Sequence, residues 1–262
     1  MINQNPMNYV RAKKGLGQHF LKDRNIARKI VDNLGAEESD QILEVGPGMG
    51  ILTHYLIKRY SNRLKLIEID AESVIYLEQN FPELRGDIIH ADFLKVDLSA
   101  IFNGHFVLIG NFPYNITSQI FFKILEYREF ITLALGMVQK EVAERICAPP
   151  GSRTYGILSV LLQSFYTTEY LFSVSRDVFV PPPNVRSAVI RLERNKVKRL
   201  DCNEKLFFQV VKAAFNHRRK MLRNSLGQVY GDIPVEFQQL RPEQLSVSQF
   251  ILLTRHIESA MT

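Results

Sequence analysis

Apolar and polar positions follow two recurring patterns along the first two thirds of the chain. Short continuous apolar runs, typical of strands buried on both faces, alternate with longer segments in which apolar residues recur every three or four positions. The predicted strands are Gln41–Val45, Lys65–Ile69, Ile88–His90, Phe106–Gly110 and Ile131–Val138. The predicted helices are Asp23–Leu34, Ile51–Arg59, Ala71–Asn80, Ser118–Tyr127 and Lys140–Cys147. This alternation predicts an α/β fold with a mostly parallel sheet and helices on both faces.

The pattern changes in the last third. Gly156–Phe165 again has a helical pattern, and two later runs, Tyr166–Ser173 and Ser187–Glu193, suit strands that could pair antiparallel at a sheet edge. We expect the charged run Arg191–Asp201 to be a linker. The segments after it are helical: Glu204–Phe215, Lys220–Leu226, a short turn starting at Pro242 and Glu243, and Ser246–Glu258. The sequence thus predicts a larger domain over residues 1–198 and a small all-helical domain over residues 199–262.

Composition narrows the class of protein. The chain has 262 residues and is 46% apolar, which suits a globular protein. No apolar run approaches the roughly 20 residues that span a bilayer, and no secretory signal begins the chain, so we expect no membrane partner. Cys147 and Cys202 have neither metal-ligand spacing nor the pattern of a disulfide framework. We therefore expect no metal and a reducing, cytoplasmic location.

The net charge of +6 is unevenly distributed. Cations gather near the start of the chain, in a basic arm within about residues 1–22, and again late in the chain: Arg11, Lys13, Lys14, Arg218, Arg219, Lys220 and Arg223. Such clusters favour a polyanionic partner, with nucleic acid the leading candidate. The late cluster could instead be a solvated face above an apolar seam.

A glycine-rich turn and a set of acids follow the predicted strands. Glu44 begins Glu-Val-Gly-Pro-Gly-Met-Gly, in which Gly46 and Gly48 allow a tight turn and close approach to a ligand. Glu68 ends the second strand about 20 residues later, where an acid can bind the ribose hydroxyls of an adenosine cofactor, whereas Asp70 suits a helix cap. Asp92 follows the third strand and could accept a hydrogen bond from the amino group of the cofactor adenine, with Phe93 packing nearby. It could instead simply cap a helix or a turn.

The fourth strand ends in Asn111-Phe112-Pro113-Tyr114. The Asn111 side-chain oxygen and a backbone carbonyl can each accept one hydrogen of an adenine N6 amino group, and the Tyr114 ring can stack on the base. Alone, this string is equally an ordinary turn. Because parallel strands bring their carboxyl ends to one edge, the four features together favour a site for S-adenosylmethionine and an adenine acceptor.

These residues, read with two further motifs, resemble the KsgA-type small-subunit ribosomal RNA adenine N6,N6-dimethyltransferases. The resemblance rests on Gly17–Leu21, Glu44–Gly50, Glu68, Asp92, Asn111–Tyr114, Val178–Ser187 and Phe215–Leu226, and covers about residues 13–226. It implies a Rossmann-like domain with a helical C-terminal domain, and dimethylation of two adjacent adenosines in a hairpin near the 3′ end of small-subunit rRNA, late in assembly. Immature 30S-type particles are then the partner, and a monomer is expected.

The resemblance also implies site residues. The cofactor would be held by His19, Leu21, Gly46, Glu68, Asp92 and Asn111, with Gln18, Glu44, Gly48, Ile69 and Phe93 completing the predicted site. Phe179 and Tyr114 would sandwich the flipped adenine, although a core role for Phe179 is the alternative. The family commonly has Asn where this chain has His19, and Gln or Ser where it has His217, so a side-chain amide contact at the first position would be lost. The basic arm would be mobile until cofactor or RNA binds.

Two other functions stay open. One is a large-subunit rRNA adenine methyltransferase of the macrolide-resistance type, which shares the N-terminal domain and the Asn-x-Pro-Tyr type of motif. The Pro-rich loop and the late basic segment favour the small-subunit enzyme. The other is a non-catalytic ribosome assembly factor on the same fold, against which the intact Glu68, Asp92, Asn111 and Tyr114 argue.

Overall fold

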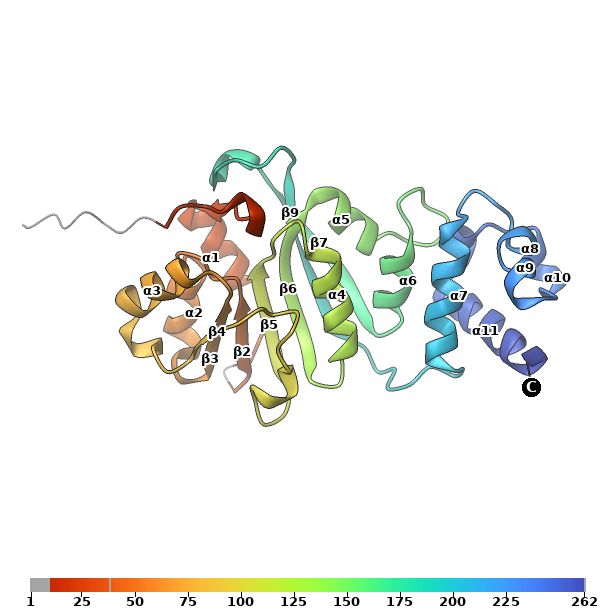
Figure 1. Ribbon diagram of the computed structural model, residues 1–262, viewed down its shortest axis with the longest axis horizontal. Helices are drawn as coiled ribbons and strands as arrows, with labels where there is room; N and C mark the ends of the chain where they lie inside the picture. Colours follow the sequence, from red (N-terminus) through yellow and green to blue (C-terminus); the bar gives the residue numbers. More distant parts are fainter. Residues whose placement is uncertain (1–9, 38, 262) are drawn as a thin grey trace, which may run out of the picture. The chain divides into compact units, whose positions relative to one another are not determined.

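The computed structural model describes residues 10–37 and 39–261, in which a seven-stranded sheet is the main feature (Figure 1). The strand order is β4-β3-β2-β5-β6-β9-β7, and the first five of these strands pair in parallel. Their bounds are β2 (Gln41–Val45), β3 (Leu64–Glu68), β4 (Ile88–His90), β5 (Phe106–Asn111), β6 (Ile131–Gln139), β7 (Tyr166–Val174) and β9 (Ser187–Arg194). The predicted Rossmann-like sheet is confirmed, with β9 and β7 neighbouring each other at one edge.

The helices begin and end within two residues of most predicted bounds. They are α1 (Arg24–Asp32), α2 (Thr53–Tyr60), α3 (Ala71–Asn80), α4 (Thr117–Glu126), α5 (Lys140–Ile146), α6 (Ile157–Gln163), α7 (Glu204–Asn216), α8 (Leu222–Ser225), α9 (Gly227–Tyr230), α10 (Val235–Gln238) and α11 (Val247–Met261). Asp23 and Asp70 cap α1 and α3 as predicted, because their carboxylates accept hydrogen bonds from the free backbone N–H groups at the start of each helix. None of the helices in the described part is long and apolar enough to cross a bilayer.

Two predictions for the last third were correct only in part. The charged run expected to be a linker begins inside β9, which continues to Arg194. The helix expected over Lys220–Leu226 is present only as the shorter α8, which α9 follows, and the basic residues before it, His217 to Lys220, form a turn. The break falls at Met221, which is extended with φ −64° and ψ 152°.

Contacts divide the chain into two compact units. One comprises the chain through Lys140 together with Tyr170–Leu192, and the other comprises Glu141–Glu169 together with Glu193 onward. The second unit is mainly helical, so a C-terminal helical region is present as expected. The domain boundary between residues 198 and 199 stays a prediction.

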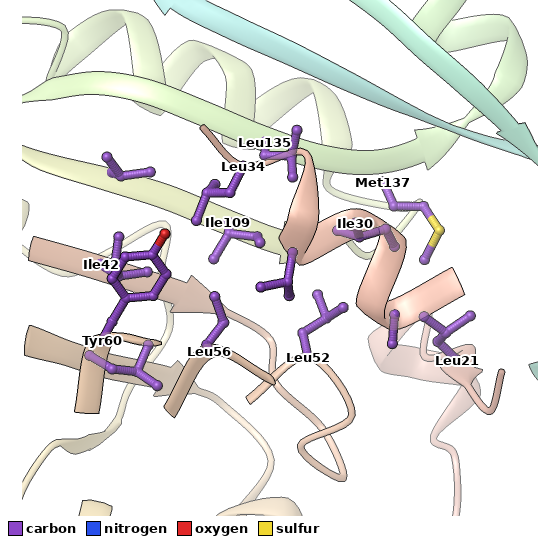
Figure 2. Close-up of a cluster of buried hydrophobic side chains, with 14 of the residues drawn as sticks. Leu21, Ile30, Leu34, Ile42, Leu52, Leu56, Tyr60, Ile109, Leu135 and Met137 are labelled. Carbon is purple, nitrogen blue, oxygen red and sulfur yellow. The ribbon is translucent and has the colours of Figure 1, made fainter. Parts of the chain in front are cut away.

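The core of the first unit explains why its strands are so apolar. Alternate strand residues, among them Ile42, Ile109, Leu135 and Met137, meet Ile30 of α1, Leu34 shortly after that helix and Leu56 of α2 (Figure 2). The intervening residues Leu43 and Leu108 are fully buried as well. Because both faces are covered, the strands lack the hydrophobic alternation of a half-exposed sheet.

A short antiparallel ribbon lies outside the main sheet. β1 (Phe20–Leu21) pairs with β8 (Phe179–Val180), with Phe20 opposite Val180 and Leu21 opposite Phe179. The ribbon joins the N-terminal segment to the segment that precedes the Pro-rich turn, two parts of the chain that are about 160 residues apart. It therefore fixes the residues just before it, Gln18 and His19, beside the sheet edge.

Candidate active site

The carboxyl ends of β2, β3, β4 and β5 meet at one edge of the sheet and border a cleft. The cleft holds about 940 Å³ of space, a figure that includes its solvent-open part. The predicted site residues that line it are Gln18, His19, Gly46, Gly48, Glu68, Ile69, Asp92, Phe93, Asn111, Phe112, Pro113 and Tyr114. Leu21, Glu44 and Phe179 are not among its lining residues.

Glu68 and the glycine turn are held together by hydrogen bonds. The Gly48 N–H donates to Glu68 Oε2 at 3.0 Å, while the Ile69 and Asp70 N–H groups donate to Oε1 at 3.0 and 2.9 Å. Burial raises the pKa of Glu68, and the N–H donors of Asp70 and Gly48 counteract this rise. The turn needs glycine, since Gly48 has a φ of +56° and an added Cβ would lie 2.7 Å from the Phe20 ring.

Glu44 lies behind the turn, not in the cleft. Its side chain is buried and accepts from Thr53 Oγ1 at 2.7 Å, at the first residue of α2. Burial raises the pKa of Glu44 to about 8, with a smaller contribution from the nearby Glu68 carboxylate. Glu44 borders a small adjoining cavity together with Pro47 and Asn111. In this structure it supports the turn and the strand ends.

The segment after β4 is anchored by a lysine that the sequence did not single out. Asp92 lines the cleft, and its Oδ1 also accepts from Leu94 N–H at 3.0 Å, so the turn role anticipated as an alternative is present. Lys123 of α4 is 7% exposed, and its Nζ donates to the carbonyls of Leu94 at 3.1 Å and Val96 at 2.6 Å. Burial lowers the pKa of Lys123. Only the fold reveals this role, because 27 residues or more separate the partners.

Asn111 has an oriented side chain. Its Nδ2 donates to the His19 carbonyl at 2.9 Å, which leaves Oδ1 as the acceptor on the other side of the amide. Phe112, next in the motif, is 1% exposed, and its N–H donates to the Met137 carbonyl at 3.0 Å. Its ring fills a slot that exists because Gly110 and Gly136 lack side chains: a Cβ on either would approach the ring to 2.9 or 2.4 Å. Phe112 therefore anchors the motif to β5 and β6.

Tyr114 is held by two neighbours. Its hydroxyl shares a 2.5 Å hydrogen bond with Ser187 Oγ of β9, and burial raises its pKa. The His19 ring lies 5.4 Å from the Tyr114 ring, centroid to centroid, and is tilted by 31°. His19 Nδ1 lies 2.8 Å from the Pro181 carbonyl. Ser187 was missed as a supporting residue, although it closes the Pro-rich motif in the sequence.

The structure does not bring Phe179 to the cleft. Its side chain is 1% exposed and belongs to the core cluster, and its backbone pairs with Leu21 across the ribbon. The expected sandwich of Phe179 and Tyr114 around a base is thus absent here, and the core alternative describes the observed placement. Leu21, also in the core cluster, supports the cleft through this pairing.

The predicted basic residues fall into two groups. Lys13 pairs with Asp70 at 2.5 Å and Glu72 at 3.0 Å, so the basic segment expected to be mobile is anchored at this residue to the start of α3. Arg218 pairs with Glu243 at 3.8 Å and donates to the Arg153 carbonyl. Arg11, Lys14, Arg219, Lys220 and Arg223 are exposed. No cluster of His, Cys, Asp or Glu that could hold a metal is present in the described part of the chain.

A Rossmann-like sheet with a glycine turn, an acid at the end of β3 and an Asn-x-Pro-Tyr motif at one edge is typical of the class of methyltransferases that use S-adenosylmethionine. The sequence model of the ribosomal RNA adenine dimethylase family matches residues 9–244. The chain belongs to this family.

Similar proteins agree with this assignment. The "Ribosomal RNA small subunit methyltransferase A" of Parabacteroides distasonis is 55% identical over 96% of this chain and 97% of its own length. The protein of the same name from Flavobacterium johnsoniae is also 55% identical, over 97% and 98%. Among solved structures, a dimethyladenosine transferase from Plasmodium falciparum has a TM-score of 0.78 at 23% identity, covering 93% of this chain and 98% of that one. The 23S rRNA methyltransferase ErmE has a TM-score of 0.68 at 26% identity, with 90% and 99% covered.

Proposed function

We propose that this protein transfers methyl groups from S-adenosylmethionine to N6 of two adjacent adenosines in the 3′-terminal hairpin of small-subunit rRNA. The single observation that supports this proposal most is the oriented Asn111 amide at the edge of the cleft, whose oxygen is left to accept a hydrogen bond from the substrate. The names of the bacterial relatives support the small subunit as the substrate. Like the family it resembles, the protein would act late, as a cytoplasmic monomer, on immature 30S-type particles.

The residues of the cleft fit the cofactor. Gly46 and Gly48 give an open backbone surface, and a Cβ at Gly46 would meet nothing within 4 Å, so its positive φ of 66° is what requires glycine. Glu68 would accept from the ribose hydroxyls, since its oxygens keep lone pairs beyond the three backbone donors. Asp92 would accept from the adenine amino group, beside Phe93. When bound, the cofactor supplies an electrophilic methyl group on sulfur.

The target adenine would be held by the motif. Asn111 Oδ1 and the Phe112 carbonyl would accept the two N6 hydrogens, because the Pro113 carbonyl already accepts from Thr117 Oγ1 at 2.9 Å. These bonds favour a pyramidal nitrogen whose lone pair faces the donor methyl, and the Tyr114 ring would stack on the base. The adenine must leave its own stack to reach this place. No strong base is needed, because the nitrogen is acidic once it carries the new methyl group.

An Asn111→Ala variant tests the proposal. Loss of one acceptor and of the contact with His19 should lower the rate of methyl transfer by at least about 100-fold, while S-adenosylhomocysteine still binds. The assay is tritium transfer to immature small subunits, with N6,N6-dimethyladenosine measured by mass spectrometry. Asn33→Ala, at the exposed end of α1, is the matched control and should transfer at the wild-type rate.

Three outcomes would contradict the proposal. Wild-type transfer by the Asn111→Ala protein would refute the assigned role of the amide. Transfer by the wild-type protein to naked large-subunit RNA but not to small subunits would favour the macrolide-resistance type of activity. Binding of small subunits with no transfer by the wild-type protein would favour the assembly-factor function.

A further inference from the structure

A second groove borders the same β1–β8 ribbon as the cleft. Phe20 lines both the cleft and the groove, and its strand partner Val180 lines the groove. The remaining walls come from the start of α1, from the start of α2 and the loop before it, and from the end of α3. Apart from Phe20, which also lines the cleft, and Leu21, none of the residues predicted to hold the cofactor or lining the cleft lines this groove.

The groove carries positive charge without acids. Its cations are Lys22 and Arg24, which line it together with His54, and none of its lining residues is Asp or Glu. Lys22 and Arg24 are exposed, and neither side chain forms an ion pair with a residue in the part of the chain that the structure describes. Lys58 adds a further cation, since its Nζ lies 3.1 Å from His54 Nε2. A surface of this kind attracts phosphate groups.

Aromatic rings line the same groove. Tyr55, Tyr76 and Phe81 are half-buried, which leaves part of each ring accessible. Tyr55 has two neighbours: the His54 ring lies nearly perpendicular to it with the centroids 5.1 Å apart, and the Lys58 ammonium lies 5.7 Å from its centroid. Cations combined with accessible rings are typical of sites for single-stranded nucleic acid, in which the backbone follows the charges and unpaired bases stack on the rings.

We propose that this groove binds the single-stranded RNA that flanks the target adenosine. The proposal rests on the proposed function, because an adenosine inserted into the cleft leaves its neighbours along the strand at the rim. The ribbon shared by cleft and groove gives these neighbours a continuous path. Lys22 and Arg24 bind phosphates, and Tyr55 stacks on an unpaired base. This surface supplements the exposed cations of the turn before α8.

The test compares two double variants of the full-length protein. Lys22→Gln with Arg24→Gln removes the groove charges, and Arg85→Gln with Lys198→Gln removes two exposed charges elsewhere. The probe is a fluorescein-labelled RNA hairpin with two adjacent adenosines in its loop. The groove variant should bind it about tenfold more weakly, and the slope of log Kd against log salt should fall by about 1.4, since each single-strand phosphate contact contributes about 0.7. The control variant should match the wild type.

Further measurements separate folding from binding. The groove variant should keep wild-type affinity for S-adenosylhomocysteine and a wild-type melting temperature; if it does not fold, the single Lys22→Gln change should lower the slope by about 0.7. Tyr55→Leu should weaken RNA binding about tenfold at an unchanged slope.

Wild-type affinity and slope for the groove variant, or equal losses in both double variants, would overturn the groove assignment and leave the proposed function intact. A wild-type protein that binds S-adenosylhomocysteine but neither binds nor methylates the hairpin would instead overturn the RNA target itself.

Discussion

Replacing Gly136 with Ala should disable methyl transfer from a position outside the cleft. A Cβ at Gly136 would lie 2.4 Å from Phe112 Cε2 and 2.9 Å from Cδ2, whereas ordinary contacts exceed about 3.4 Å. The ring cannot move away freely, because Gly110 lies at its opposite edge and the Phe121 ring packs against it with the centroids 6.0 Å apart. The ring must therefore shift by roughly 1 Å, and overpacking of this kind costs about 1–3 kcal/mol.

The shift should affect chemistry more than cofactor binding. Phe112 joins Asn111 to the Pro113 turn, and its N–H is bonded to Met137 next to the substituted residue. A displacement of about 1 Å in the groups that hold the acceptor nitrogen lowers rates by about 100-fold. Glu68 and Asp92 follow other strands, so the Kd for S-adenosylhomocysteine should stay within about threefold of wild type. Each 1 kcal/mol of lost stability should lower Tm by about 2–4 °C.

Two further variants make the interpretation specific. Gly86→Ala places a methyl group where nothing lies within 4 Å, so its transfer rate and Tm should match the wild type. Adding Phe112→Leu to Gly136→Ala should make room in the slot and recover most of the lost Tm. The reasoning would be refuted by a Gly136→Ala protein with both wild-type kcat and wild-type Tm, or by equal damage from Gly86→Ala.

Two other residues give predictions of their own. Lys123→Met should raise the Kd for S-adenosylhomocysteine about tenfold, measured by calorimetry, because the Leu94 and Val96 carbonyls lose a buried donor. In an Asp92→Ala background the same change should leave the Kd as it is. A Lys95→Met control should bind S-adenosylhomocysteine normally. Glu44 keeps its proton to about pH 8 in the folded state but only to about 4.5 when unfolded, so it costs stability progressively as pH rises through that window. Glu44→Gln should therefore make the fall in Tm between pH 5 and 9 less steep than in the wild type. Parallel plots of Tm against pH for the two proteins would contradict the raised pKa of Glu44.

The sequence predicted the sheet well because its signals were local. Continuous apolar runs marked strands covered on both faces, and β2, β4 and α3 begin and end at the predicted residues. Asp23 and Asp70 were identified as caps because capping depends on residues two or three positions away. The meeting of Glu68, Asp92 and Asn111 at one cleft followed from the topology of parallel strands.

The errors involve partners that are distant in the chain. Phe179 and Tyr114 are both aromatic residues in quoted motifs, and only the pairing of β8 with β1 places the first in the core. Lys13 was treated as a free cation because its partner Asp70 lies 57 residues away. Lys123 and Ser187 were overlooked for the same reason, since a lysine or serine within an apolar element gives no local sign of what it binds.

One rule connects the correct predictions with the failures. Successive side chains of a strand face opposite sides, so residues two apart share a face. On three neighbouring strands a core residue is followed two positions later by a polar one: Ile42 by Glu44, Leu66 by Glu68, and Ile109 by Asn111. The three polar residues thus continue the core face to the edge of the sheet, where α1 and α2 no longer supply apolar partners. Glu68 and Asn111 reach the cleft, whereas the first residue of α2, Thr53, engages Glu44 behind the turn. The strand pattern therefore places these three polar residues side by side at the edge of the sheet. The start of the following helix then determines which of them can contact a ligand.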